Sequence, residues 1–223
     1  MSEDTLILLA SSSPRRRELI ALGNWTFSVS ASNVDESQHL GETPSEYVLR
    51  LSEAKARVAG KSSRSQDLIV AADTVVVDQN TLLGKPKDRA EAVKMLQALR
   101  GHNHQVYTGL AVLKMSNNQL LKDLCVTNVP MRDYSDAEIE AYASTGGPFD
   151  KAGAYGIQDP GFHPVEDMHG CYASVMGLPL CHLVRVLQKM DITPSSEIPA
   201  NCQTFLHYQC PVSRSILRGE QVG

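Results

Sequence analysis

The chain has 223 residues, of which 42% are hydrophobic, and this suits a soluble globular protein with room for a substantial core. Its formal net charge is −4, so no global basic field exists and a nucleic-acid polymer is not expected as a partner. No apolar run approaches membrane-spanning length, and the five cysteines lack CxxC spacing, so we expect reduced thiols, no membrane and a cytoplasmic location.

The first predicted elements are a buried strand and a helix with an unusually basic start. The apolar run Thr5–Leu9 predicts the strand, and Pro14 opens the helix with Ser13 as its N-cap. Arg15–Arg17 fill the first turn, where they oppose the positive end of the helix dipole. A polyanion at this helix start would meet free N–H groups and guanidinium groups together. A phosphate site and a solvated basic turn both stay open at this point.

The next segment contains a strand, a polar loop and a strongly capped helix. Residues 25–29 alternate like a strand, and the loop after them carries Glu36. Thr43 and Glu46 form a capping box that starts a helix running to about Gly60. Lys55 falls on the apolar stripe of that helix. Its position favours a lysine that snorkels to solvent, and a lysine pointing into a cleft is the alternative.

An apolar strand with a carboxylate in its middle follows at Leu68–Val77. Burying Asp73 in such a run is costly unless the carboxylate is paired, bound to metal or placed at the mouth of a site. If the hairpin after this strand turns at Gln79–Asn80, Lys85 returns opposite Thr74 and beside Asp73. The pattern therefore predicts an acid and a base close together.

The central part of the chain predicts two further capped helices around a long hairpin. The helices start at Asp88 and Ser135, and the strands occupy residues 105–114 and 120–134. His102 and His104 lie in the turn before the hairpin, and without a third ligand we interpret them as solvated turn residues.

The last third contains a glycine-rich segment, a final helix and a tail. Residues 150–158 include an Asp-Lys pair, and ordinary turn chemistry explains this segment as well as nucleotide binding does. A helix starts near Leu180, and no periodicity follows it. We expect one domain over residues 1–190 and a loosely ordered tail over 191–223. The irregular alternation of strands and helices predicts an α/β fold with a mixed sheet and flanking helices.

Several cations and a pair of carboxylates are distributed over these elements. Together they are what metal-assisted chemistry on a triphosphate requires, because cations hold phosphate oxygens while carboxylates hold Mg²⁺ or accept a proton from water. The sequence has neither a P-loop nor the nucleophile elbow of a Ser-His-Asp enzyme. The residues concerned are Arg15, Arg16, Arg17, Glu36, Lys55, Asp73, Lys85 and Lys151.

An ordered set of short motifs resembles the Maf family of nucleoside triphosphate pyrophosphatases. Each motif is weak alone, but together they occur in family order between Leu6 and Leu187. The motifs are residues 10–16, 34–36, 50–56, 72–76, 84–86, 107–109, 150–158 and 177–180.

The resemblance implies a fold, a reaction and an assembly. The fold is similar to that of the inosine-triphosphate pyrophosphatases, with a long mixed sheet and two lobes around a cleft. The reaction cleaves a nucleoside triphosphate between its α- and β-phosphates with a divalent metal, Mg²⁺ or Mn²⁺, and the protein would be a homodimer. The implied catalytic residues are Asp73 (the proton acceptor), Lys85, Lys55 and Glu36, the metal ligands Glu36 and Asp73, and the substrate-binding residues Ser11, Arg15, Arg16, Thr74, Lys151 and Gln158.

Three positions that sort the family by base are Arg15, Thr74 and Gln158. This combination resembles the branch that acts on dTTP and UTP, and on modified pyrimidine nucleotides, in contrast to the branch acting on 7-methyl-GTP. Gln158 offers a donor and an acceptor to a pyrimidine edge. The alternative is a nucleotide-sensing regulator of cell division without significant turnover. The intact acid at Asp73 favours the enzyme, since a sensor needs no group to activate water.

Overall fold

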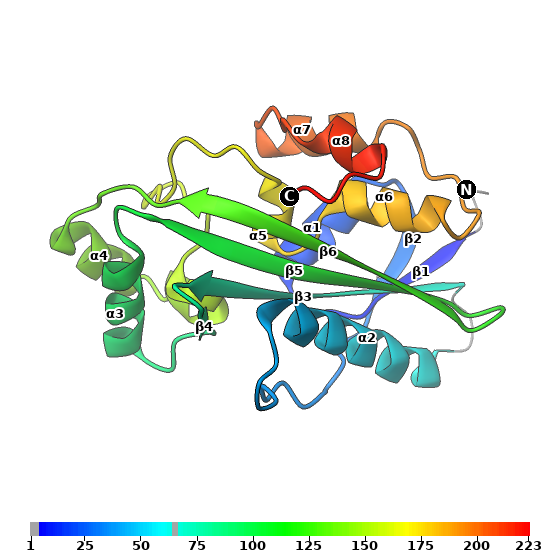
Figure 1. The fold of residues 1–223 in the computed structure, drawn as a ribbon, viewed down its shortest axis with the longest axis horizontal. Helices are drawn as coiled ribbons and strands as arrows, with labels where there is room; N and C mark the ends of the chain where they lie inside the picture. Colours follow the sequence, from blue (N-terminus) through cyan, green and yellow to red (C-terminus); the bar gives the residue numbers. More distant parts are fainter. Residues whose placement is uncertain (1–4, 64–66) are drawn as a thin grey trace.

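The protein is an α/β fold built on one mixed sheet, as Figure 1 shows for a computed structural model that describes residues 5–63 and 67–223. No helix in these two ranges is long and apolar enough to cross a membrane. The strands are β1 (Leu6–Leu9), β2 (Thr26–Val29), β3 (Leu68–Asp78), β4 (Thr81–Leu83), β5 (Asn103–Lys114) and β6 (Gln119–Pro130). The helices are α1 (Pro14–Ala21), α2 (Pro44–Ser62), α3 (Arg89–Leu99), α4 (Asp136–Ala143), α5 (Tyr172–Met176), α6 (Leu180–Gln188), α7 (Ile198–Leu206) and α8 (Ser213–Leu217), with two 3₁₀ turns, η1 (Gly147–Asp150) and η2 (Ala152–Ala154).

The sheet order is β2-β1-β3-β5-β6, with β4 added beside β3. β1 runs parallel to β2 and β3, whereas β3, β5 and β6 are antiparallel in turn, so the expected mixed sheet is confirmed. Successive side chains of β3 point to opposite faces. Val70 and Ala72 join the main core, and Ile69 and Ala71 pack in a second core with residues of α2. Helix α2 covers one face, while α5 to α8 lie over the other (Figure 1).

The three strongest helix starts predicted from the sequence are confirmed. Thr43 and Ser135 each form a complete capping box, and the Asp88 carboxylate accepts the backbone N–H of Glu91. Helix α1 begins differently. Ser13 is its N-cap, as predicted, but its side chain makes no capping hydrogen bond, so the helix start keeps donors for other partners.

One edge of β3 has a gap that determines where a ligand can enter. Along its other edge the strand pairs with β5 from Leu68 to Val77. On the open edge, β1 pairs only as far as Val70 and β4 only from Val76 onward. Residues 71–75 therefore have no sheet neighbour on that side within the described chain, and this stretch contains Asp73 and Thr74. The gap also lies beyond the carboxyl end of β1, where open α/β sheets bind their ligands.

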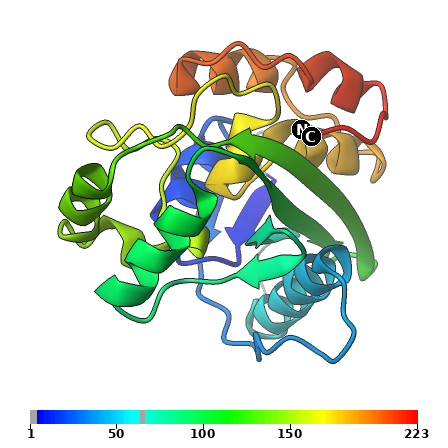
Figure 2. The same ribbon diagram turned by 60° about the vertical axis from the view of Figure 1, so that its left-hand side comes forward.

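The elements divide into two lobes joined by the long β5–β6 hairpin. Figure 2 shows α3 and α4, with η1 and η2, in one lobe at one end of the hairpin. The strands β1 and β2 and helix α2 belong to the other lobe. The open edge of β3 lies between these two groups. This division agrees with the two-lobed fold that the resemblance implies.

The C-terminal segment is more ordered than the sequence suggested. We expected a loosely ordered tail after Met190, but α7 and α8 pack against α6, and Ile198 and Ile216 are completely buried. The Arg185 side chain reaches from α6 to the backbone carbonyl oxygens of Ile216 and Glu220. The stability of these two helices comes from tertiary packing against α6, which no local sequence pattern reveals.

The interpretation of the two histidines as solvated turn residues was wrong for His104, whereas His102 does lie in the turn and is half-buried. Strand β5 already begins at Asn103, and His104 is only 3% exposed with its Nε2 atom 2.8 Å from the Tyr155 hydroxyl. Burial lowers the pKa of His104 to about 4, so the ring is neutral. The His102 Nε2 atom lies 2.9 Å from Asp78 Oδ1 at the end of β3. Both histidines therefore brace the sheet.

Candidate active site

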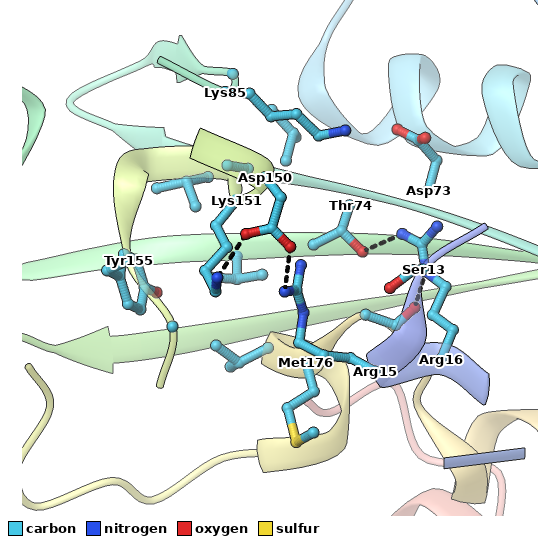
Figure 3. A pocket seen from close by; sticks show the side chains of 18 of the residues that line it. Ser13, Arg15, Arg16, Asp73, Thr74, Lys85, Asp150, Lys151, Tyr155 and Met176 are labelled. Carbon is cyan, nitrogen blue, oxygen red and sulfur yellow. Dashed lines mark hydrogen bonds and ion pairs between the residues drawn. The ribbon is translucent and has the colours of Figure 1, made fainter. Parts of the chain in front are cut away.

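A cleft of about 320 Å³ opens at the free edge of β3, and a second cavity of about 310 Å³ adjoins it at the start of α1. Figure 3 shows side chains from both lobes pointing into the first cavity. All ten residues predicted for the site line one of the two cavities. Ser11 lines the adjoining cavity, and the main cleft is lined by Arg15, Arg16, Glu36, Lys55, Asp73, Thr74, Lys85, Lys151 and Gln158.

At the centre of the cleft one lysine holds two carboxylates. Lys55 Nζ lies 2.5 Å from Asp73 Oδ1 and 2.6 Å from Glu36 Oε1. Lys55 and Asp73 are 9% and 8% exposed, so the interpretation of Lys55 as a snorkelling lysine was wrong. The lysine points inward because Asp73 projects from β3 toward α2. Desolvation raises the pKa of Glu36, but the hydrogen bond and charge of Lys55, with the charges of Lys85 and Arg16, lower it on balance.

Lys85 reaches the cleft but does not pair with β3 as predicted. The β3–β4 ladder ends with Val76 opposite Leu83, two residues before Thr74 and Lys85 would stand opposite each other. The Lys85 side chain lines both cavities. It makes no ion pair with any residue of 5–63 or 67–223, because Lys55 has taken the place beside Asp73. Lys85 is thus a cation held near the carboxylates and available to a ligand.

Arg16 is fixed in the cleft wall by three different segments. Its Nε donates to the Gly177 carbonyl oxygen at 2.8 Å, and its terminal nitrogens donate to Thr74 Oγ1 at 3.1 Å and Ser11 Oγ at 3.4 Å. Desolvation lowers the pKa of Arg16, and the charge of Asp73 opposes this shift. Gly177 has φ of 108°, and a Cβ there would stand 3.0 Å from Arg16 Nε. A glycine is therefore needed here both for the turn after α5 and for the close approach of the Arg16 side chain.

The hydroxyl groups of Thr74 and Thr108 form a hydrogen-bonded chain that holds Arg16 in place. Thr108 Oγ1 donates its proton to the Ser174 carbonyl oxygen at 2.9 Å. Thr74 Oγ1 lies 2.9 Å from Thr108 Oγ1, so the Thr74 hydroxyl must be the donor in that pair, and it accepts from Arg16. Thr74 consequently has no proton left for a ligand. Thr108 was missed as a supporting residue, although it lies in one of the short family-like motifs, residues 107–109.

A second carboxylate cluster joins the two lobes across the cleft. Asp150 accepts from Arg15 Nη1 at 3.0 Å and from Lys151 Nζ at 2.5 Å (Figure 3). Desolvation raises the pKa of Asp150, but Lys151 and Arg15 lower it on balance. Asp150 was not predicted as a site residue, and only its position beside Lys151 pointed to it. Gln158 is exposed at the cleft, and its amide makes no hydrogen bond within the described residues.

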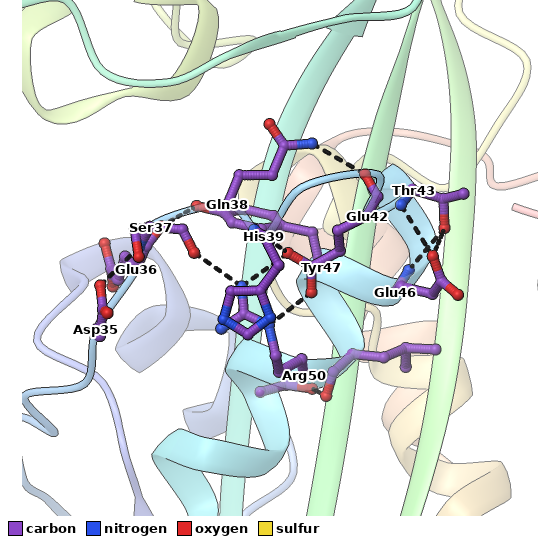
Figure 4. Close-up of polar contacts among 12 residues, drawn as sticks. Asp35, Glu36, Ser37, Gln38, His39, Glu42, Thr43, Glu46, Tyr47 and Arg50 are labelled. Carbon is purple, nitrogen blue, oxygen red and sulfur yellow. Dashed lines mark hydrogen bonds and ion pairs between the residues drawn. The ribbon is translucent and has the colours of Figure 1, made fainter.

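The loop that carries Glu36 is held by helix α2, as Figure 4 shows. The Tyr47 hydroxyl donates to the Glu36 carbonyl oxygen at 2.8 Å, and Arg50 donates to the Ser37 carbonyl oxygen at 3.0 Å. Arg50 also forms a two-pronged ion pair with Glu42, at 2.5 and 2.8 Å. The hydrogen bonds from Arg50 lower the pKa of Glu42 to about 2. Sequence reasoning found Arg50 only as part of a motif, since its partner is set by loop geometry.

The cleft also has an apolar wall. The rest of its lining comes mainly from apolar side chains and two tyrosines, including Tyr47, Val76, Val106, Tyr155, Ile157, Val175 and Met176. The cleft therefore combines charged groups, including Arg16 of α1 and Lys55 of α2, with an apolar surface to which α5 and residues 155–157 contribute. Such a combination suits a ligand with an anionic end and a ring.

Comparison with known proteins identifies relatives of this chain. Residues 6–190 match the family described as Maf-like protein. The dTTP/UTP pyrophosphatase of Clostridium botulinum (strain Okra / Type B1) is 44% identical over 189 residues, covering 83% of this chain and 97% of that protein. A protein of the same name from Dehalococcoides mccartyi (strain ATCC BAA-2266 / KCTC 15142 / 195) is 42% identical over 188 residues, covering 84% of each. Among solved structures, the Staphylococcus aureus Ham1 protein aligns over 91% of this chain and 98% of that chain, with 14% identity and a TM-score of 0.40, too low to carry an argument.

Proposed function

The chain belongs to the Maf family, and from this membership we propose that it hydrolyses dTTP and UTP, together with modified pyrimidine nucleotides, to the monophosphate and pyrophosphate. One observation supports the proposed mechanism above all others. Lys55 is shared by Asp73 and Glu36 at the gap in β3, within a cleft whose other charged groups are mostly cations. This arrangement supplies an acid–base group beside a site for phosphates.

The triphosphate would lie along the basic side of the cleft. Arg16 is already fixed there, and a fixed guanidinium loses little conformational entropy when it binds an anion. Lys85 is free to move onto a phosphate oxygen. The start of α1 adds backbone N–H groups that its N-cap side chain leaves unbonded. Ser11 contributes a hydroxyl and also orients Arg16.

Asp73 is our candidate for the group that accepts the proton of the attacking water. Its Oδ1 atom is occupied by Lys55, and its Oδ2 atom is left to take the proton. Lys55 would hold the carboxylate in one orientation and balance its charge beside the incoming phosphates. Pyrophosphate would leave toward Lys85 and Arg16, where its charge is neutralised.

The carboxylates also fit a divalent metal, for which we propose Mg²⁺ or Mn²⁺. Glu36 and Asp73 contact the same Lys55 nitrogen, so their oxygens lie within about 5 Å of each other. No group of three or more potential ligand side chains that could hold a metal occurs in the described chain. Mg²⁺ often binds through one or two carboxylates and completes its shell with water and substrate phosphates. When bound, the metal would neutralise phosphate charge and polarise the reacting phosphoryl group.

For base selection we propose Gln158 as the residue in direct contact with the pyrimidine. Its amide is exposed and unbonded among the described residues, whereas Thr74 is committed to Arg16 and Thr108. Arg15 is tied to Asp150 and would act from the edge of the cleft. Thr74 would then influence substrate choice through Arg16.

The test is pyrophosphate release from a panel of nucleoside triphosphates with Mg²⁺ or Mn²⁺. We expect release from dTTP and UTP above that from purine nucleotides, with loss of turnover in Asp73→Asn. Binding of nucleotide without release from any member of the panel would contradict the proposal. Release mainly from a 7-methylated purine nucleotide would contradict the base assignment alone.

A further inference from the structure

The five cysteines, dispersed in the sequence, converge on one region of the fold. They come from β6 (Cys125), the N-cap of α5 (Cys171), α6 (Cys181), α7 (Cys202) and the connection between α7 and α8 (Cys210). All five are free thiols, and all except Cys125 line one narrow, largely apolar pocket. Cys125 is buried in the same hydrophobic core as Cys171 and Cys202. The region lies on the sheet face opposite α2, beneath α7 and α8 (Figure 1).

Within this region Cys171 and Cys210 line the same pocket. The Tyr208 hydroxyl, two residues before Cys210, donates to the carbonyl oxygen of Gly170, the neighbour of Cys171, at 2.9 Å, so the two segments lie side by side. Cys171 is 4% exposed and Cys125 is 1% exposed, while Cys210 is accessible to solvent. An oxidant arriving from solvent would therefore meet Cys210 first, with Cys171 in the same pocket.

The surroundings of Cys210 favour its thiolate. The side chain of Cys171, followed by the backbone N–H groups of Val212 and Ser213, lowers the pKa of Cys210 to about 7 against the opposing effect of burial. Burial instead raises the pKa of both Cys181 and Cys202 to about 12. Reactivity toward an oxidant follows thiolate character and exposure together. The pKa of Cys125 is also lowered, chiefly by its interaction with Cys171, but Cys125 is buried, so Cys210 is the thiol that meets both criteria.

We propose that Cys171 and Cys210 form a redox site in which hydrogen peroxide converts the two neighbouring thiols into a disulfide. The Cys210 thiolate attacks one peroxide oxygen, the O–O bond breaks, and the released hydroxide takes a proton to become water. The Cys171 sulfur then attacks the resulting sulfenic acid, an S–S bond forms, the S–O bond breaks and a second water leaves. Two thiols lose two electrons to one peroxide molecule, and two equivalents of an external thiol, which end as its disulfide, restore them.

The position of this bond gives it a structural consequence. Cys210 belongs to residues 191–223, which lie beyond the family match at 6–190, whereas Cys171 belongs to the matched region. A disulfide would tie the α7–α8 connection to the start of α5. The other end of α5 is Gly177, whose carbonyl oxygen holds Arg16. The site is separate from the proposed function and does not depend on it.

A metal site is the main alternative for such a cluster. Three thiolates can bind zinc or copper when they point to a common centre. Among the described residues, however, no set of three or more cysteine, histidine or carboxylate side chains is arranged to hold a metal ion. Disulfide formation needs only two sulfur atoms within reach of each other, and Cys171 and Cys210 line the same pocket.

The experiment treats the reduced full chain with hydrogen peroxide, blocks the remaining thiols with N-ethylmaleimide in denaturant, and measures the intact mass. We expect three of the five thiols to be blocked and the other two to be joined within one chain. Chymotrypsin can cut after Tyr172 and Leu180, and after Phe205 and Tyr208, so it separates Cys171 from Cys181 and Cys202 from Cys210. The cross-linked peptide should contain Cys171 and Cys210, and dithiothreitol should release it.

Two serine variants complete the test. Cys210→Ser should abolish the cross-link and leave Cys171 as a thiol, whereas Cys181→Ser, a change at the same pocket, should leave the cross-link intact. Five blocked thiols after treatment would overturn the proposal. So would a Cys125–Cys171 link, a link between two chains, or oxidation of Cys210 that ends at the sulfinic acid in the wild-type protein. Each readout is a mass, so failure of the proposed activity would not affect it.

Discussion

Two buried ion-pair clusters lie on opposite faces of the sheet, and they differ in how completely their groups are used. On the face covered by the tail, Arg185 holds Asp123 through two nitrogens at 2.8 and 2.7 Å, and its third nitrogen contacts the carbonyl oxygens of Ile216 and Glu220. On the α2 side, Lys55 holds Asp73 and Glu36, but 58% of the Glu36 side chain is exposed. The first cluster is closed and the second is open.

The difference indicates which cluster is structural and which is functional. A buried pair whose donors and acceptors are all satisfied offers nothing to a ligand. The cleft instead brings five cations together with three carboxylates: Arg15, Arg16, Lys55, Lys85 and Lys151 with Glu36, Asp73 and Asp150. This excess of positive charge is uncompensated until an anion binds. Similar ion-pair chemistry therefore fixes the C-terminal helices in one place and leaves a binding site in the other.

The largest effect on the open cluster should come from Asp73→Asn. The amide cannot accept the proton of an attacking water, and removal of a general base typically costs about 10²–10⁴-fold in rate. Nucleotide binding should remain measurable by calorimetry, because the cations of the cleft are untouched. Pyrophosphate release measures the loss. Activity close to that of the wild-type protein would exclude Asp73 as the proton acceptor.

A substitution in the closed cluster should lower the stability of the protein without lowering its turnover. Asp123→Asn removes the charge that balances a guanidinium only 3% exposed, and breaking a buried pair in this way costs about 3–5 kcal/mol. Urea unfolding would measure the change, and activity assayed well below the unfolding transition should be preserved. A variant of unchanged stability, or one that is stable but inactive, would contradict the assignment of this pair as structural.

A smaller effect is expected from loosening the loop that presents Glu36. Arg50→Lys replaces the two-pronged contact with Glu42 by a single ammonium, so the carbonyl oxygen of Ser37 loses its donor. If Glu36 binds metal, loss of such a supporting contact should weaken apparent metal affinity about tenfold. The readout is the metal concentration that gives half-maximal activity, with kcat at saturating metal changed much less.

The matched control is Arg57→Lys, which alters an exposed i,i+4 pair with Glu53 on the same helix. It should leave the metal dependence unchanged, because exposed pairs contribute little. Equal shifts in both variants would mean that α2 as a whole is affected. A fall in kcat alone in Arg50→Lys would show that the loop does not act through metal binding.

Local signals made much of the fold predictable. Capping boxes at Thr43 and Ser135 and the apolar run of β3 are each determined by residues close in sequence, and the structure contains all three elements. Residue types alone pointed to seven of the ten site residues, and the resemblance added Ser11, Thr74 and Gln158. The structure gathers all ten around the cleft and its adjoining cavity. Their roles there stay predictions.

Contacts between residues far apart in the chain could not be predicted from the sequence. The partner of Asp73 proved to be Lys55, because the strand alternation that directs Asp73 toward α2 matters more than the hairpin that returns Lys85. The helices of the tail depend on Arg185, which lies outside them in sequence. The cysteines gather in one region from positions 125, 171, 181, 202 and 210, and no spacing rule connects these. In each case the decisive contact depends on how the layers pack.

The smallest expected effect is on the preference between substrates and not on the overall rate of turnover. Gln158→Glu replaces an amide that can donate and accept by a carboxylate that only accepts. A uracil or thymine edge presents a carbonyl oxygen that the carboxylate would repel, while the amino group of cytosine would donate to it. Loss of one neutral hydrogen bond, worth about 1 kcal/mol, predicts that the ratio of kcat/KM for UTP to that for CTP falls about fivefold.

Gln188→Glu, which adds the same charge at the exposed end of α6, is the control and should leave the ratio unchanged. An unchanged ratio in Gln158→Glu would mean that another group in the cleft contacts the base, and Arg15, released from Asp150, would become the first candidate.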